Sequence, residues 1–155
     1  MLILSESMIG RAVRYGKLGK LTIYLLSNED ITLFKGITER PKDLEDINVL
    51  TSATVTSTGT FNWNAIKSEC EVQTQHLKIE GHLYNRFLEL FEKYQIRVPI
   101  LSWLKNRDKK HILQDVYELR LDKGFTHEQI IEQFKKDGFS KKEIAIVESF
   151  GKKKK

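Results

Sequence analysis

Cysteine is nearly missing from this chain of 155 residues, in which Cys70 is the one thiol. One thiol cannot form an internal disulfide, and the sequence shows no pair of histidines at the spacing that metal ligands need. We therefore expect no disulfide framework, no metal site and a reducing, cytoplasmic environment.

Long apolar runs are missing as well. Residues 1–4 are apolar, but Ser5, Glu6 and Ser7 follow them directly. A secretory signal needs a longer apolar region, and a membrane span needs about 20 apolar residues. The sequence therefore predicts a soluble protein with no membrane partner.

The sequence also lacks a recognisable catalytic motif. The glycines at positions 10, 16 and 19 precede an expected strand, whereas a phosphate-binding loop precedes a helix. The four histidines stand in unlike contexts, outside any motif for a nucleophile, a metal or a phosphate loop: His76, His82, His111 and His127. We expect a protein that is not an enzyme and that needs no cofactor.

Neither sign of charge dominates the first half of the chain. Residues 1–80 hold 9 Lys and Arg against 10 Asp and Glu, whereas residues 81–155 hold 17 against 11. Apolar residues make up 40% of the chain, which is enough to bury a core. The formal charge of +5 therefore arises in the second half.

The first 80 residues are typical of short strands separated by turns. Alternating apolar residues predict a hairpin with a turn at residues 27–30, and a charged loop is expected at residues 38–48. We expect a small antiparallel barrel or sandwich over residues 1–80. Its strands are expected at residues 21–26, 31–35, 49–57, 61–63 and 66–72, with a turn at residues 58–60.

Residues 81–151 have helical spacing instead. Apolar residues predict a helix from about residue 83 to 94, a second from about residue 100 and a third over residues 108–121. Two further helices follow, each with a capping-box pattern, at Thr126 with Gln129 and at Ser140 with Glu143. Three glycines are expected just after helix ends, where a left-handed residue is favourable: Gly124, Gly138 and Gly151.

A basic arm precedes the apolar run of residues 21–26. No acidic residue lies between Glu6 and Glu29, while cations and two tyrosines gather there. Such a mixture suits contact with a phosphate backbone and stacking on bases. The alternative is a solvated strand edge whose charges prevent aggregation. The candidate nucleic-acid-binding residues of the arm are Arg11, Arg14, Tyr15, Lys17, Lys20 and Tyr24.

A second basic cluster is expected between two helices, at Lys105, Arg107, Lys109 and Lys110. If the following helix folds back on the barrel, the arm and this cluster form one electropositive track; the alternative is an ordinary charged loop. The lysines of residues 152–155 are expected to form a basic tail that attracts any polyanion.

The opening of the chain resembles the RecO family of recombination mediators. The similar segments are residues 5–17, residues 20–27 with their Leu-Thr-Ile-Tyr-Leu-Leu run, and Lys35-Gly36 followed by Pro41-Lys42. The resemblance covers about the first 42 residues. It implies an N-terminal OB barrel, binding and annealing of single- and double-stranded DNA, and partnership with a single-strand binding protein or a recombinase.

Together these features predict an α+β protein with an OB-like β domain at residues 1–80, a helical domain at residues 81–151 and a basic tail at 152–155. The expected function is non-enzymatic DNA binding of low sequence specificity in recombination or repair, with DNA favoured over RNA. The alternative is a protein-interaction adaptor or inhibitor that uses the C-terminal helices, which exposure of Phe134, Ile146 or Phe150 would favour.

Overall fold

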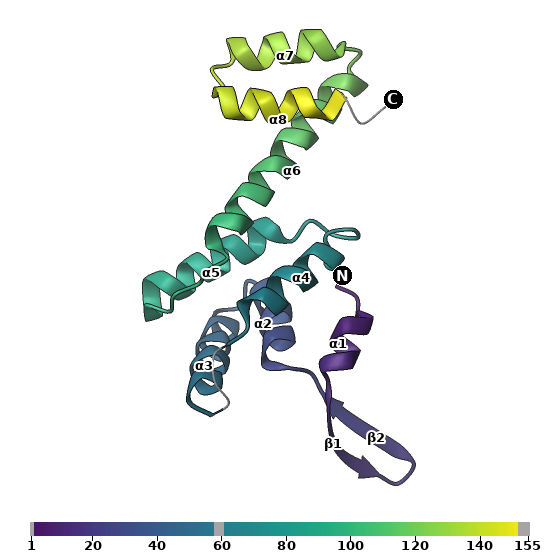
Figure 1. The fold of residues 1–155 in the computed structure, drawn as a ribbon, viewed down its shortest axis with the longest axis vertical. Helices are drawn as coiled ribbons and strands as arrows, with labels where there is room; N and C mark the ends of the chain where they lie inside the picture. The colour runs from purple at the N-terminus through teal and green to yellow at the C-terminus, as the bar shows by residue number, and fades with distance from the viewer. Residues whose placement is uncertain (1, 58–60, 152–155) are drawn as a thin grey trace. The chain divides into compact units, whose positions relative to one another are not determined.

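A computed structural model describes residues 2–57 and 61–151 of the chain, and these residues are mostly helical (Figure 1). They divide into two units, residues 1–105 and 106–155. The first unit holds α1 (Glu6–Arg11), β1 (Val13–Leu18), β2 (Leu21–Leu25), α2 (Asn28–Gly36), α3 (Pro41–Ser57), α4 (Trp63–Gln73) and α5 (Glu80–Tyr94). Helix α6 (Leu101–Asp122) begins in the first unit and continues into the second, which also contains α7 (His127–Lys136) and α8 (Lys141–Gly151).

The predicted OB-like barrel is wrong. The described residues contain one sheet, which is the antiparallel pair of β1 and β2, and two strands cannot close into a barrel. The expected partner of residues 21–26 was residues 31–35, but β2 pairs with β1 and residues 31–35 belong to α2.

Helix α2 forms because its first turn is capped. The side-chain oxygen of Ser27 accepts a hydrogen bond from the backbone N–H of Asp30 at 3.1 Å, and Glu29 and Asp30 supply acidic side chains near the positive end of the helix dipole. The residues expected as a hairpin turn are therefore a helix start.

Helices α3 and α4 replace the remaining expected strands and the expected loop. Pro41 stands at the first position of α3, where its fixed φ suits a helix and its missing N–H costs nothing. In α4 the side-chain oxygen of Asn62 accepts from the N–H of Ala65 at 3.2 Å. The turn expected at residues 58–60 lies outside the described residues, as does the tail at 152–155.

Helix α2 lies against α3, α4 and α5 and lines the core of the first unit (Figure 1). Leu33, Ile47, Ile66 and Phe87 are among the buried core side chains. The helix expected over residues 83–94 is confirmed as α5.

The second unit agrees with the sequence except for the start of its first helix and the place of Gly151. Both capping boxes form, and Gly124 and Gly138 have φ of +86° and +80°. Gly151 instead ends α8 in helical conformation. The expected break between two helices at residues 105–110 is wrong, because these charged residues include neither proline nor glycine and continue α6 as ordinary helix formers.

Buried side chains of α6, α7 and α8 form the core of the second unit, and they include Tyr117, Phe134 and Val147. Among the helices of the described residues, none combines the length and the apolar character needed to cross a membrane.

Candidate nucleic-acid interface

The basic arm is a β-hairpin that extends from α1 and α2 (Figure 1). Gly19 and Lys20 connect its strands, and Gly19 has φ of +60°, as the first central residue of a type II′ turn requires. The register pairs Val13 with Leu25 at the base and Leu18 with Leu21 at the tip. A bulge at Tyr15 interrupts the ladder between these ends.

The register places Arg14 opposite Tyr24 and Lys17 opposite Thr22. Residues that pair directly across an antiparallel ladder share a face, so these four side chains lie on the same side of the hairpin. Tyr24 is 60% exposed, and Arg14 and Lys17 are exposed as well. We call Arg14, Lys17, Thr22 and Tyr24 the basic hairpin face.

Lys20 and Tyr15 lie on the hairpin outside its paired positions. Lys20 occupies the turn, and the ring of Tyr15 at the bulge is 72% exposed. Among the described residues, no carboxylate forms an ion pair with Arg14, Lys17 or Lys20. These three cations therefore remain available to an external anion.

A pocket of about 460 Å³ adjoins the basic hairpin face at its base. Tyr24 forms one wall, and apolar side chains of Leu4, Ile9, Ala12 and Leu26 form the others. A flat apolar group that stacks on Tyr24 fits such a pocket.

The opposite side of the hairpin carries no polar side chain. The same alternation brings together Val13, Gly16, Leu18, Leu21, Ile23 and Leu25, which we call the apolar hairpin face. The sequence analysis missed this face, because it paired residues 21–26 with the wrong strand.

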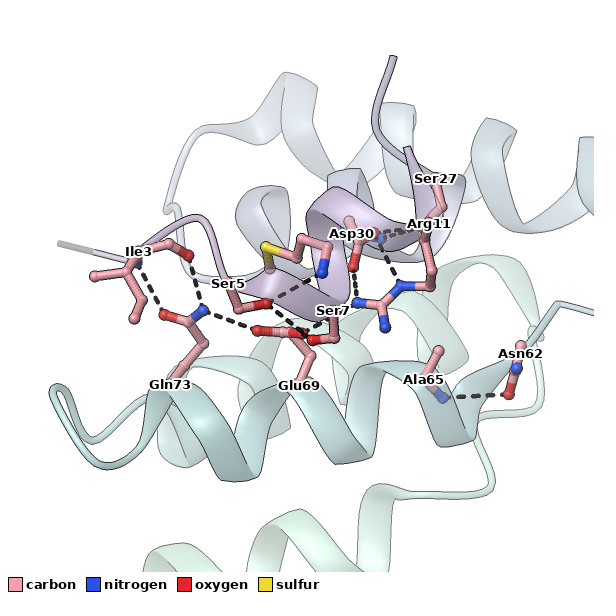
Figure 2. Close-up of polar contacts among 11 residues, drawn as sticks. Ile3, Ser5, Ser7, Arg11, Ser27, Asp30, Asn62, Ala65, Glu69 and Gln73 are labelled. Carbon is pink, nitrogen blue, oxygen red and sulfur yellow. Dashed lines mark hydrogen bonds and ion pairs between the residues drawn. The ribbon is translucent and has the colours of Figure 1, made fainter. Parts of the chain in front are cut away.

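Arg11 is separated from the other candidate residues by its ion pairs (Figure 2). Its Nε lies 3.1 Å and its Nη2 lies 2.5 Å from the two carboxylate oxygens of Asp30. Nη2 also donates to Glu69 Oε2 at 3.1 Å. The hydrogen bond to Asp30 raises the pKa of Arg11 despite partial burial, and the one to Glu69 adds to this. Arg11 thus holds α1 to α2 and α4.

Glu69 and Gln73 on α4 anchor the segment before the hairpin (Figure 2). Ser7 donates to Glu69 at 2.6 Å, and the Gln73 amide exchanges two hydrogen bonds with the backbone of Ile3. Burial acts to raise the pKa of Glu69, but the hydrogen bonds from Ser7 and Gln73 outweigh it, so the pKa lies below its usual value. Both side chains are 1% exposed.

This anchor positions the hairpin, because Val13 begins β1 two residues after Arg11. Sequence reasoning missed the anchor. The available signal was helical spacing: Ile66, Glu69, Cys70 and Gln73 share the buried face of α4, so the two polar residues are buried with the apolar ones.

The second basic cluster lies on α6 and has mixed surroundings. The ammonium of Lys105, in the first unit, lies 5.9 Å from the ring centre of Tyr84. Lys109, in the second unit, forms a 2.8 Å ion pair with Glu143, whose pKa this contact and Ser140 lower to about 2. Arg107 and Lys110 line a pocket of about 250 Å³ with Tyr117. A continuous track joining this cluster to the arm stays a prediction.

Comparison of the chain with protein-family models, with curated proteins and with solved structures finds no match. The resemblance to RecO therefore stays a prediction.

Proposed function

We propose that this protein binds single-stranded nucleic acid, without catalysing a reaction, through the basic hairpin face. The observation that carries the proposal is the cross-strand pair of Arg14 and Tyr24, with Lys17 on the same exposed face and no acidic residue on either strand. Positive charges that can contact phosphates and an aromatic ring that can stack on bases thus lie side by side.

Each group has a separate task in this proposal. Arg14, Lys17 and Lys20 contact successive phosphates, while Tyr24 stacks on a base whose other side enters the apolar pocket beside Ile9. Stacking contributes about 1–3 kcal/mol per base and is available to every base. Single strands are favoured over duplex because their bases are free to leave the stack, and the RecO resemblance favours DNA.

The pocket also predicts low sequence specificity. Apart from the Tyr24 hydroxyl, the side chains that line it are aliphatic and offer no hydrogen-bond donor or acceptor with which to distinguish one base from another. Partnership with a single-strand binding protein or a recombinase, which the RecO resemblance implies, stays a prediction.

Fluorescence anisotropy with a labelled oligothymidylate tests the proposal. We expect the double variant Arg14→Glu/Lys17→Glu to bind at least about tenfold more weakly, because two phosphate contacts become repulsive. Tyr24→Ala should weaken binding about tenfold, whereas Tyr24→Phe should retain it because the ring remains. With three phosphates contacted, the logarithm of the affinity should fall with the logarithm of salt concentration at a slope of about −2.

The matched control is Lys42→Glu/Arg97→Glu, which changes the net charge equally at two exposed positions outside the hairpin. Equal loss of binding in this control and in the hairpin variant would reduce the interaction to overall charge. Equal binding of heparin and of the oligonucleotide would contradict the proposed stacking on Tyr24.

The alternative of an adaptor using the C-terminal helices stays a prediction, and the three side chains that would favour it contribute to the core of the second unit. Phe134 is completely buried, and Ile146 and Phe150 pack against the core of the second unit. Ile146 and Phe150 are only partly buried, whereas Phe134 offers no surface to a partner.

A further inference from the structure

The apolar hairpin face is exposed to an extent that a folded protein rarely leaves uncovered. Val13, Leu18 and Leu21 are 68%, 72% and 63% exposed, and Leu25 and Ile23 are 50% and 36% exposed. Among the described residues, 10 of the 16 large hydrophobic side chains that are exposed lie between Ile3 and Leu25. This concentration marks an interaction surface, because single exposed hydrophobics are ordinary but a contiguous patch is not.

The hairpin itself also needs a partner. A two-stranded hairpin is marginally stable in water unless other strands or a helix pack on it. The helices of the first unit leave both faces of this one exposed. A partner that covers the apolar hairpin face would therefore stabilise the hairpin.

We propose that the apolar hairpin face packs against the same face of a second copy of this chain, about a twofold axis. Two copies of the same aliphatic face are chemically complementary to each other, and a twofold operation buries the same residues on both. The face has no charged or hydrogen-bonding side chain with which to select a different, polar partner.

Charge favours this arrangement as well. Arg14 and Lys17 lie on the opposite side of each hairpin, so packing the apolar faces together keeps the cations of the two copies apart. The dimer would present two basic hairpin faces pointing outward. The inference itself does not depend on nucleic-acid binding.

The area suits a reversible dimer. Fully burying an aliphatic side chain removes roughly 60–120 Å² from water, so the five aliphatic side chains at their observed exposure contribute about 170–350 Å² per copy. A stable interface of standard size buries about 800 Å² per partner. The aliphatic side chains thus supply roughly a fifth to two fifths of that area, and hairpin backbone and neighbouring residues would supply the rest. We expect a dissociation constant in the micromolar range.

Sedimentation velocity on the full chain over a range of concentrations tests the dimer. The variant Leu21→Thr/Ile23→Thr/Leu25→Thr keeps residues that favour strands and leaves the net charge unchanged. We expect it to dissociate at least about tenfold more readily than the wild type, because three aliphatic contacts per copy are lost. The control Val49→Thr/Ile112→Thr/Leu119→Thr makes the same kind of change at exposed helical positions and should leave the dimer intact.

Disulfide trapping supplies a second test. Ile23 lies near the middle of the apolar hairpin face, whereas Thr22 points to the other side. Mild oxidation should cross-link Ile23→Cys into a covalent dimer and leave Thr22→Cys monomeric. The native Cys70 is buried and should not react.

Two results would overturn the proposal. The first is a wild-type chain that remains monomeric at about 100 μM, well above the micromolar range that the buried area implies. The second is cross-linking of Thr22→Cys as efficient as that of Ile23→Cys.

A monomer that floats with phosphatidylcholine vesicles would show that lipid, and not a second copy, covers the face. Oligonucleotide binding by the monomeric threonine variant separates failure of this proposal from failure of the proposed function.

Discussion

Arg11 and Arg14 stand three residues apart, and their surroundings give them different tasks. Arg11 forms ion pairs with Asp30 and Glu69, both nearly inaccessible to solvent, and so belongs to the framework of the first unit. Arg14 has no such partner among the described residues and faces solvent beside Tyr24. Local sequence could not separate the two arginines, because the partners of Arg11 are 19 and 58 residues away.

The anchor at Glu69 leads to the first prediction about stability. Glu69→Gln should lower the free energy of unfolding by about 2 kcal/mol, because it removes a charge that accepts from Ser7 and Arg11 in a buried site. Urea unfolding followed by circular dichroism measures this change. Glu71→Gln, two residues on in α4 and exposed, is the control and should be near neutral. Equal stability of the two variants would show that the anchor contributes nothing.

The elements of the first unit depend on contacts between helices more than on local preference. Gly36 at the end of α2 illustrates this, because a Cβ there would lie 2.7 Å from Leu83 Cδ2 and 3.4 Å from Phe87 Cε1. Leu83 and Phe87 are both completely buried, so α2 and α5 approach each other closely at a position that only glycine allows.

A pair of glycine substitutions tests this approach. Gly36→Ala should destabilise the protein by about 1–2 kcal/mol, because overpacking against buried side chains outweighs the better helix propensity of alanine. Gly10→Ala in α1 meets no atom within 4 Å and should stabilise by up to about 1 kcal/mol. Thermal or urea unfolding of both variants measures the contrast. A gain in stability at both positions would mean that α2 and α5 pack less tightly than described.

For the molecule as a whole, buried carboxylates link folding to pH. Asp43 on α3 accepts a hydrogen bond from the Thr38 hydroxyl, which is the main cause of a pKa well below its usual range. Lys35 and Arg40 lower this pKa further, with nitrogen atoms 2.9 Å and 2.7 Å from the carboxylate. The pKa of Glu69 is also below its usual value.

The direction of the pH effect follows from these shifts. A carboxylate whose pKa is lower in the folded state stabilises the fold above its unfolded pKa of about 4, and this contribution is lost as the pH falls toward the folded value. We therefore expect the free energy of unfolding of the first unit to decrease when the pH is lowered below about 4. The Asp43→Asn variant should have a free energy of unfolding about 1–3 kcal/mol below that of the wild type at pH 7. This difference between variant and wild type should become smaller in acid. Urea titrations between pH 7 and pH 3 measure both effects. A difference in the free energy of unfolding that stays constant over this range would contradict the stabilising role of the Asp43 carboxylate.

Sequence reasoning succeeded where the determining contacts span only a few residues. The capping boxes at Thr126 and Ser140 and the left-handed Gly138 involve hydrogen bonds to residues three to five positions away. The tip of the hairpin at Gly19 also obeys local turn chemistry, although the sequence analysis assigned the turn to residues 27–30. Of the candidate site, the exposed cations and tyrosines of the hairpin were identified, but their common face depended on the true register.

The sequence by itself determined the helical second unit, its caps and the acid-free basic arm, because caps, turns and charge patterns act within a few residues. Only the tertiary structure decided that Asn28–Gly36, Pro41–Ser57 and Trp63–Gln73 are helices. Short apolar runs are compatible with both the helical and the strand period, and here Leu33 and Ile66 pack into the same core as Phe87. The tertiary structure also decided that Arg11 belongs to the anchor, because its ion pairs join residues that are distant along the chain. The strand register likewise decided which side chains share each exposed face of the hairpin.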